Sequence, residues 1–361
     1  GYCIKIVIKM SKTSDLLFWY NQQNYNLPWR TDQDPYKIWI SEIMLQQTQV
    51  QTVIPYYLNW VQQYPAVEDL ASAKIDDLLL IWQGLGYYKR VHNILSTAKI
   101  IVKEYNGKFP QDYANLITLS GIGDYTASMI LSIAFQESIN VPIDGNIKRI
   151  MSRLYILPLE ATTLKNYKKH TIDYIDSSNP GDSIQALMDL GREICKPMNP
   201  LCCDCPINTY CIANQKNLTD KFPIKIKKKS IPHYNISVGL IWHKNQFIIS
   251  KRKKNQLLGG LWELPGGKRK IQENALQCLK REIKEELDIK VVKPKEIGTI
   301  QHKYSHMKLS ITLFVCDYKE GKAKSLASEE IKWIQYREKK DFAFPSATHK
   351  LFKIYEVKKC K

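Results

Sequence analysis

The stretch LSGIGDYTAS at residues 119–128 holds two glycines, Gly121 and Gly123, in a G-x-G turn with helical sequence on both sides. Glycine adopts positive φ without strain, and it lets backbone N–H groups approach a phosphate at the start of a helix. A turn of this kind more often simply connects two helices, so the motif has little weight by itself. Its interpretation depends on what the rest of the chain contains.

Basic residues dominate the charge of the chain. Its 361 residues include 53 Lys and Arg against 35 Asp and Glu, which gives a formal net charge of +18. Clustered cations bind nucleic acid by displacing counterions from phosphates, so this charge modestly favours a polyanionic partner over a solvated lysine coat. No apolar run reaches the ~20 residues of a membrane span, and the segment before Met10 lacks a signal-peptide core. We therefore expect a cytoplasmic protein.

The chain is long enough for two domains, and its pattern changes near residue 216. Residues 14 to about 215 are mostly helical in pattern, with Asp34 and Pro35 as N-cap and first residue of one helix and Asp144 at the start of another. A basic segment with two prolines follows at 216–233, typical of a linker. The remainder predicts strands at 234–242, 246–252, 308–318 and 331–336, and helices at 273–287 and 346–358. The fold class is thus an all-α domain followed by an α+β domain.

Four of the nine cysteines, Cys195, Cys202, Cys205 and Cys211, follow the spacing C-x6-C-x2-C-x5-C. Four thiolates suit either zinc or an iron–sulfur cluster, and the spacing by itself leaves both open. The pattern resembles the [4Fe–4S] loop of the endonuclease III superfamily of DNA glycosylases. That resemblance implies a [4Fe–4S] cofactor on these four residues and implies that the G-x-G turn is a DNA-binding helix–hairpin–helix.

Tyr125 stands just beyond that turn, where lyase members of the superfamily have a lysine. An amine forms a Schiff base with the sugar and a phenol does not, so Tyr125 favours a monofunctional glycosylase that activates water. Glu42 shares a helical face with apolar side chains, which should desolvate its carboxyl group and raise its proton affinity. Asp144 enters a helix, whose N–H groups and dipole would keep it ionised. One neutral and one charged carboxyl group suit cleavage of an N-glycosidic bond.

Three segments, WISEIMLQQTQV, QGLGYYKRVHNI and VPIDGNIKRI, resemble MutY-type adenine DNA glycosylases, which remove adenine mispaired with 8-oxoguanine. The resemblance implies that Glu42 is the acid and Asp144 the stabilising carboxylate, with Tyr125 and Asn146 in support. It also implies base flipping, because a base inside a duplex cannot be reached. The further positions that match the family's pocket, wedge and orphan-base contacts are Trp29, Arg30, Gln47, Thr48, Leu85, Tyr87 and Asp189.

The C-terminal part contains a nearly complete Nudix box from Gly267 to Ile289, with Asp288 where the motif has glycine. Glu282, Glu285 and Glu286 of this box would lie together and could bind Mg²⁺. MutY-type proteins carry a Nudix-like domain that reads 8-oxoguanine. The family's Phe-Ser-His reader loop corresponds here to Tyr304, Ser305 and His306, with Ser305 expected on the oxidised base.

The combined prediction is a monomer that acts on double-stranded DNA containing A·8-oxoguanine or A·G mispairs. Its predicted parts are a glycosylase domain at 10–216, a hairpin at about 115–131, a cluster loop at 195–211, a linker at 217–233 and a Nudix-like domain at 234–361. Two alternatives remain open: an endonuclease III-like glycosylase and lyase, and a Nudix nucleotide pyrophosphohydrolase. Tyr125 argues against the glycosylase and lyase, and the intact glutamates of the Nudix box keep the pyrophosphohydrolase open.

Overall fold

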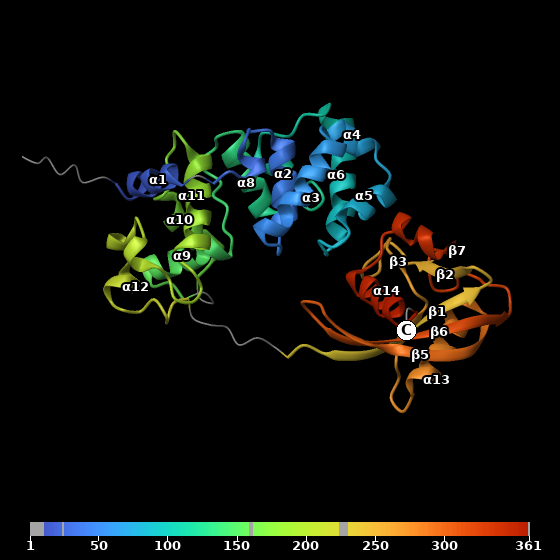
Figure 1. Ribbon diagram of the computed structural model, residues 1–361. Coiled ribbons are helices and arrows are strands. Elements are labelled where there is room, and N and C mark those ends of the chain that lie inside the picture. The colour runs from blue at the N-terminus through green and yellow to red at the C-terminus, as the bar shows by residue number, and fades with distance from the viewer. Residues whose placement is uncertain (1–10, 24, 159–161, 224–229, 360–361) are drawn as a thin grey trace, which may run out of the picture. The chain divides into compact units, whose positions relative to one another are not determined.

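A computed structural model describes residues 11–23, 25–158, 162–223 and 230–359 (Figure 1). The segment before Met10 and residues 224–229 of the predicted linker lie outside these ranges. Contacts along the chain define two compact units, residues 1–71 with 96–227 and residues 72–95 with 228–361. The sequence places 72–95 in the helical domain, whereas the contacts group this segment with the C-terminal residues, so the domain bounds stay a prediction.

The first unit is helical. Its helices are α1 (Lys12–Gln22), α2 (Pro35–Leu45), α3 (Val50–Gln63), α7 (Tyr113–Leu116), α8 (Asp124–Ala134), α9 (Gly145–Tyr155), α10 (Leu164–Ile172), α11 (Pro180–Glu193) and α12 (Ile212–Gln215), with 3-10 turns η1 (Pro28–Arg30), η2 (Cys202–Asp204) and η3 (Asn208–Tyr210). Helices α4 (Val67–Ser72) and α6 (Lys89–Tyr105) cross the unit boundary, and α5 (Ile75–Trp82) belongs to the second unit. No helix within the described ranges is both long and apolar enough to span a bilayer.

Local sequence explains where the site helices begin. The Asp34 side chain accepts the Tyr36 N–H at 2.9 Å and Pro35 occupies the first position of α2, as predicted. Helix α9 buries an apolar face of Ile147, Ile150, Met151 and Leu154 in a core with α1 and α11. This packing anchors the N-terminal end of α9, where Asp144 lies.

The second unit is built around a mixed β-sheet. Its strands are β1 (His233–His243), β2 (Gln246–Lys251), β3 (Trp262–Glu263), β4 (Gly266–Lys268), β5 (Lys290–Lys303), β6 (Lys308–Glu320) and β7 (Glu330–Gln335), followed by the turn η4 (Tyr336–Asp341). The order is β3-β2-β1-β6-β5, with β4 paired to β1 and β7 to β2. Strands β1 and β6 run parallel, and the other pairs are antiparallel.

Alternating side chains bury both faces of this sheet. Leu240 of β1 lies in one core with Phe352 of helix α14 (Ser346–Lys359). Its neighbour Ile241 lies in the other core with Ile283 of helix α13 (Ala275–Leu287). This alternation is the two-residue period of a strand. The helical unit and the unit that combines a sheet with helices confirm the predicted fold class, an all-α domain followed by an α+β domain.

Candidate functional site

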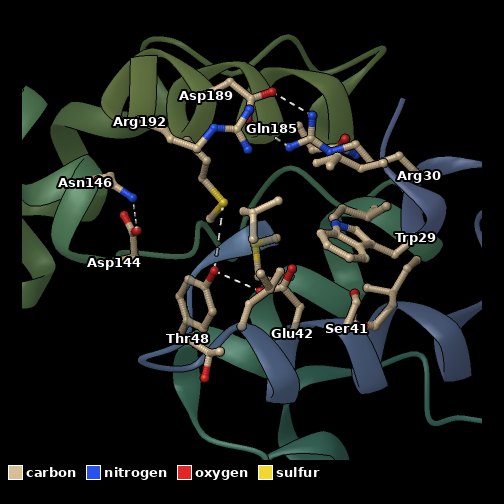
Figure 2. Close-up of a pocket in the computed structure, with 18 residues that line it drawn as sticks. Trp29, Arg30, Ser41, Glu42, Thr48, Asp144, Asn146, Gln185, Asp189 and Arg192 are labelled. Atoms are coloured by element: carbon tan, nitrogen blue, oxygen red, sulfur yellow. Dashed lines mark hydrogen bonds and ion pairs between the residues drawn. The ribbon is translucent and has the colours of Figure 1, made fainter. Parts of the chain in front are cut away.

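Seven sequence-predicted residues from five separate segments meet Glu42 at one cavity of about 240 Å³ in the first unit. We call this cavity the carboxylate pocket. The predicted residues that line it are Trp29, Arg30, Glu42, Thr48, Tyr125, Asp144, Asn146 and Asp189. In the view of Figure 2, Asp144 and Asn146 lie on one side, Trp29 and Arg30 on the other, and Glu42 between them. The two carboxyl groups therefore share one opening.

Glu42 lies in the buried interior of α2 and is 6% exposed. Burial raises the pKa of Glu42 to about 7, the direction that the sequence predicts, and the charge of Asp144 adds to this rise. The Tyr125 hydroxyl, 2.9 Å from Oε2, and the Arg30 charge oppose it. Glu42 thus exchanges a proton near neutral pH, as a general acid requires.

Asp144 is the N-cap of α9, and its two oxygens have different donors. Oδ1 accepts the backbone N–H of Ile147 at 2.7 Å, and Oδ2 accepts Nδ2 of Asn146 at 2.9 Å. Both bonds are local to the helix start, so the cap itself points the carboxylate into the carboxylate pocket. Capping and a role toward a substrate are compatible in this geometry.

Asp189 forms the opposite wall from α11, with its side chain 2% exposed. Arg30 donates to it through two nitrogens, Nη1 at 2.6 Å from Oδ2 and Nη2 at 3.1 Å from Oδ1. A buried carboxylate needs this kind of bidentate partner. Trp29, next to Arg30, packs edge-on against Tyr57 with ring centroids 5.4 Å apart.

Sequence reasoning missed several residues of the same wall. Gln185, Met188 and Arg192 also line the carboxylate pocket. With Asp189 they are spaced i, i+3, i+4 and i+7, which is the repeat of one helical face. The signal was therefore present in QALMDLGR once Asp189 was placed, but a mixed polar and apolar face resembles any amphipathic helix.

Asn146 links the carboxylate pocket to the cysteine loop. Its Oδ1 accepts Nη2 of Arg149 at 2.8 Å, and Nε of Arg149 donates to the carbonyl oxygen of Cys195 at 2.7 Å. Helix α11 approaches closely at Gly191, where an added Cβ would lie 2.6 Å from the Cβ of Asn146. A side chain at Gly191 would therefore displace Asn146, a role for this glycine that the sequence did not indicate.

One of the predicted ligand cysteines, Cys195, contacts a buried arginine. Arg153 is 2% exposed; its Nη1 lies 3.3 Å from Sγ of Cys195 and donates to the carbonyl oxygen of Lys196 at 2.7 Å. Burial raises the pKa of the Cys205 thiol to about 12, and the charges of Cys195, Cys211 and Cys202 act in the same direction. Among the described residues, no three His, Cys, Asp or Glu side chains are arranged to hold a metal ion.

The G-x-G turn joins α7 to α8. Gly121 adopts φ +81°, whereas Gly123 is extended at φ −95° and serves as the N-cap of α8 without a side-chain cap. Positive φ is thus required at only one of the two glycines. An added Cβ at Gly123 would meet nothing within 4 Å, so open space lies in front of this helix start.

The other predicted contact residues lie outside the carboxylate pocket. Gln47, after α2, and Tyr87, before α6, are exposed and adopt φ of +58° and +49°. Positive φ is uncommon for such side chains and concentrates at functional sites. Leu85, beside Tyr87, is buried.

A second cavity, of about 780 Å³, lies within the second unit. Tyr87 lines it together with Tyr304, Ser305 and His306, which form the turn between β5 and β6. Oγ of Ser305 lies 3.5 Å from Nδ1 of His306, and the Tyr304 N–H donates to the carbonyl oxygen of Met307 at 2.8 Å. The structure therefore brings the predicted reader loop and Tyr87 to one cavity.

The Nudix-box glutamates are held by protein partners. Arg281 pairs with Glu273 and Glu282 at 2.7 Å and with Glu285 at 3.0 Å. Glu286 instead accepts the backbone N–H of Gly266 at 3.0 Å, and burial raises its pKa to about 8. Asp288, which stands where the Nudix motif has glycine, adopts the left-handed conformation at φ +57°.

Comparison with protein-family models gives one match for each part of the chain. Residues 40–170 match the HhH-GPD superfamily of base excision DNA repair proteins. Residues 237–353 match the NUDIX domain. A solved thermostable thymine-DNA glycosylase superposes with a TM-score of 0.53 at 25% identity, covering 56% of this chain and 95% of that structure.

Curated relatives extend over nearly the whole chain. The adenine DNA glycosylase of Buchnera aphidicola (subspecies Schizaphis graminum) is 36% identical over 345 residues, covering 94% of this chain and 97% of the relative. The adenine DNA glycosylase of Mus musculus is 31% identical over 404 residues, covering 95% and 77%. With the two family matches, these likenesses show that the chain belongs to the adenine DNA glycosylase family of base excision repair enzymes.

Proposed function

We propose that this enzyme removes adenine mispaired with 8-oxoguanine, or with guanine, from double-stranded DNA. The observation that carries the proposal is the carboxylate pocket, in which a carboxyl group with a pKa of about 7 and an N-capping carboxylate share one opening. An adenine nucleotide rotated out of the duplex would place its base against Glu42 and its sugar toward Asp144.

Glu42 in its protonated form is the general acid. It donates its proton to a ring nitrogen of the adenine while the N-glycosidic bond breaks, and the bonding electrons leave with the base. Tyr125 donates to Oε2 of Glu42 and so orients the carboxyl group. The sugar is left as an oxocarbenium ion, whose positive charge Asp144 stabilises until water adds to the anomeric carbon. The water gives up one proton to the Glu42 carboxylate, which restores the acid. With tyrosine at 125, no amine is supplied there for a lyase step.

Three further parts of the protein would contact the DNA. The turn at Gly121 and Gly123 opens the start of α8, whose backbone N–H groups suit a phosphate. Gln47 with Thr48, in the first unit, and Tyr87, in the second, would each contact the DNA at the mispair, whereas Leu85, also predicted there, is buried. The second cavity, with Tyr304, Ser305 and His306, would receive 8-oxoguanine.

The four cysteines Cys195, Cys202, Cys205 and Cys211 would hold a [4Fe–4S] cluster. Their donor set is four thiolates on one loop, and Arg153 supplies a cation 3.3 Å from Sγ of Cys195 that suits a negatively charged thiolate group. When bound, the cluster would fix the shape of this loop. The reaction steps above use only side chains of the carboxylate pocket.

The test combines an excision assay on three duplexes with a hydrolysis assay on one free nucleotide. Duplexes with adenine opposite 8-oxoguanine, guanine or thymine are incubated with the enzyme, treated with alkali and resolved by length, and free 8-oxo-dGTP is assayed for pyrophosphate release. We expect alkali-dependent cleavage at the adenine strand, fastest opposite 8-oxoguanine. Strand cleavage without alkali would favour the lyase alternative, and pyrophosphate release with intact duplexes would favour the Nudix alternative.

Replacing Ser305 tests the reading of the orphan base. Ser305→Ala should reduce the preference for adenine opposite 8-oxoguanine over adenine opposite guanine by roughly fivefold to tenfold, because one hydrogen bond to the oxidised base is lost. The measurement is the ratio of single-turnover rates on the two duplexes. Ser325→Ala, which removes an exposed hydroxyl bonded to Ser328, is the matched control. An unchanged ratio in Ser305→Ala would place the reading of 8-oxoguanine elsewhere.

Replacing a cluster ligand tests the cofactor. Purified enzyme should contain iron and sulfide in equal amounts, and Cys211→Ser should lose both and lower the melting temperature, because the 195–211 loop loses one of the four cysteines that would hold the cluster. Cys203→Ser, at the exposed neighbouring thiol, is the control and should keep the iron. Stoichiometric zinc without iron in the native protein would contradict the assignment.

A further inference from the structure

Arg192 is a second cation on the buried carboxylate of Asp189. It lies at the C-terminal end of α11, and its Nη2 is 3.1 Å from Oδ1 of Asp189, while its Nε donates to Glu193 at 2.7 Å. The guanidinium also lies over the ring of Tyr25, 4.9 Å from the centroid. Figure 2 shows this side chain beside Asp189 at the carboxylate pocket. Its contacts to Glu193 and Tyr25 restrict the positions that the guanidinium can adopt.

The contacts fill most of the acceptor capacity of Asp189. A carboxylate has about four lone-pair positions, two on each oxygen. Oδ1 accepts from Arg30 and forms an ion pair with Arg192, and Oδ2 accepts from Arg30. The Arg192 guanidinium therefore lies against Oδ1, and the acceptor position away from this cation is on Oδ2. Without Arg192, the two oxygens would offer a free position each.

We propose that Arg192 is a specificity-determining positioning residue, which acts through Asp189 and not on the reacting atoms. By occupying Oδ1 it fixes the rotation of the carboxylate and leaves a single acceptor for the base. That acceptor suits a base edge that carries an N–H donor, such as the exocyclic amino group of adenine, and rejects an edge that presents an oxygen. The inference rests on the proposed excision of adenine.

The experiment compares adenine with purine, the base that lacks the amino group, in otherwise identical duplexes. Single-turnover excision rates are measured for the wild type, Arg192→Met and Arg192→Gln, after titration of active enzyme. We expect the adenine-to-purine rate ratio to fall about tenfold in Arg192→Met, the effect of one charge-assisted hydrogen bond. Arg192→Gln should recover part of the ratio, because its amide still offers an N–H donor to Oδ1.

Glu193→Gln is the matched control. The substitution weakens the interaction of Arg192 with Glu193 but leaves its contact with Asp189. The adenine-to-purine rate ratio should therefore stay at the wild-type value. An unchanged ratio in Arg192→Met overturns the inference, and so does an equal fall in Glu193→Gln. Arg192→Ala, at this partly exposed position, gives the same readout if the methionine variant does not fold. If the wild-type enzyme excises no adenine, the proposed function is wrong, because no adenine-to-purine rate ratio can then be measured.

Discussion

Glu42→Gln should reduce adenine excision by about 10³-fold at pH 7, within the range by which a positioned general acid accelerates a reaction. Glutamine has nearly the same shape and can still accept the bond from Tyr125, but it has no proton to give to the leaving base. The measurement is the single-turnover rate on a duplex with adenine opposite 8-oxoguanine. The wild-type rate should fall as pH rises through about 7, because the acid form of Glu42 is then lost.

The same substitution should stabilise the protein at alkaline pH. The pKa of Glu42 is raised from 4.5 to about 7 by burial, so its contribution to stability is complete below pH 4.5 and is lost as pH rises through 7. At pH 8 the buried charge costs about 3 kcal/mol, since one pKa unit corresponds to about 1.4 kcal/mol. Glutamine removes this cost, so the gain should appear at pH 8 and vanish near pH 4.

Urea denaturation at both pH values measures this difference. Glu104→Gln is the matched control, because Glu104 is exposed on α6 and should change neither the excision rate nor the stability. Equal stability of wild type and Glu42→Gln at pH 8 would mean that Glu42 is ionised without cost, which is incompatible with its role as an acid. Loss of activity without the gain in stability would point to a steric effect instead.

The periodicity of apolar residues predicted the regular helices and strands well. It failed for a strand in which that periodicity is interrupted. The hairpin of β1 and β2 and the helices α13 and α14 were predicted within a few residues. Strand β5 was not, because it contains Pro294 and several lysines. In the structure β5 is an end strand of the sheet path with register shifts on both sides of Pro294, the setting in which a sheet accepts proline.

The sequence predicted those site residues whose environment is set by their near neighbours along the chain. The apolar face around Glu42 and the helix start at Asp144 both follow from neighbours within four residues along the chain. The pairing of Asp189 and the close approach at Gly191 depend instead on side chains from other segments, Arg30 toward Asp189 and Asn146 toward Gly191. Spacing along one helix contains no information on such partners, and packing between helices supplies it.

Asp144→Asn should reduce adenine excision by 10² to 10³-fold while leaving stability nearly unchanged. Asparagine caps a helix about as well as aspartate, so the bond from the Ile147 N–H and the start of α9 should be retained. What is lost is the negative charge that faces the oxocarbenium ion, and removing one such electrostatic partner typically costs about 3 to 4 kcal/mol of transition-state stabilisation. Single-turnover rates and thermal melting measure the two effects separately.

Asp112→Asn is the matched control for this prediction. Asp112 caps α7 in the same way, accepting the Asn115 N–H at 2.9 Å, but it is exposed and does not line the carboxylate pocket. Its replacement should leave both the rate and the melting temperature near the wild-type values. Similar rates in Asp144→Asn and Asp112→Asn would mean that Asp144 only caps α9. The positive charge on the sugar would then need another partner, and the two-carboxylate mechanism would fail at its second step.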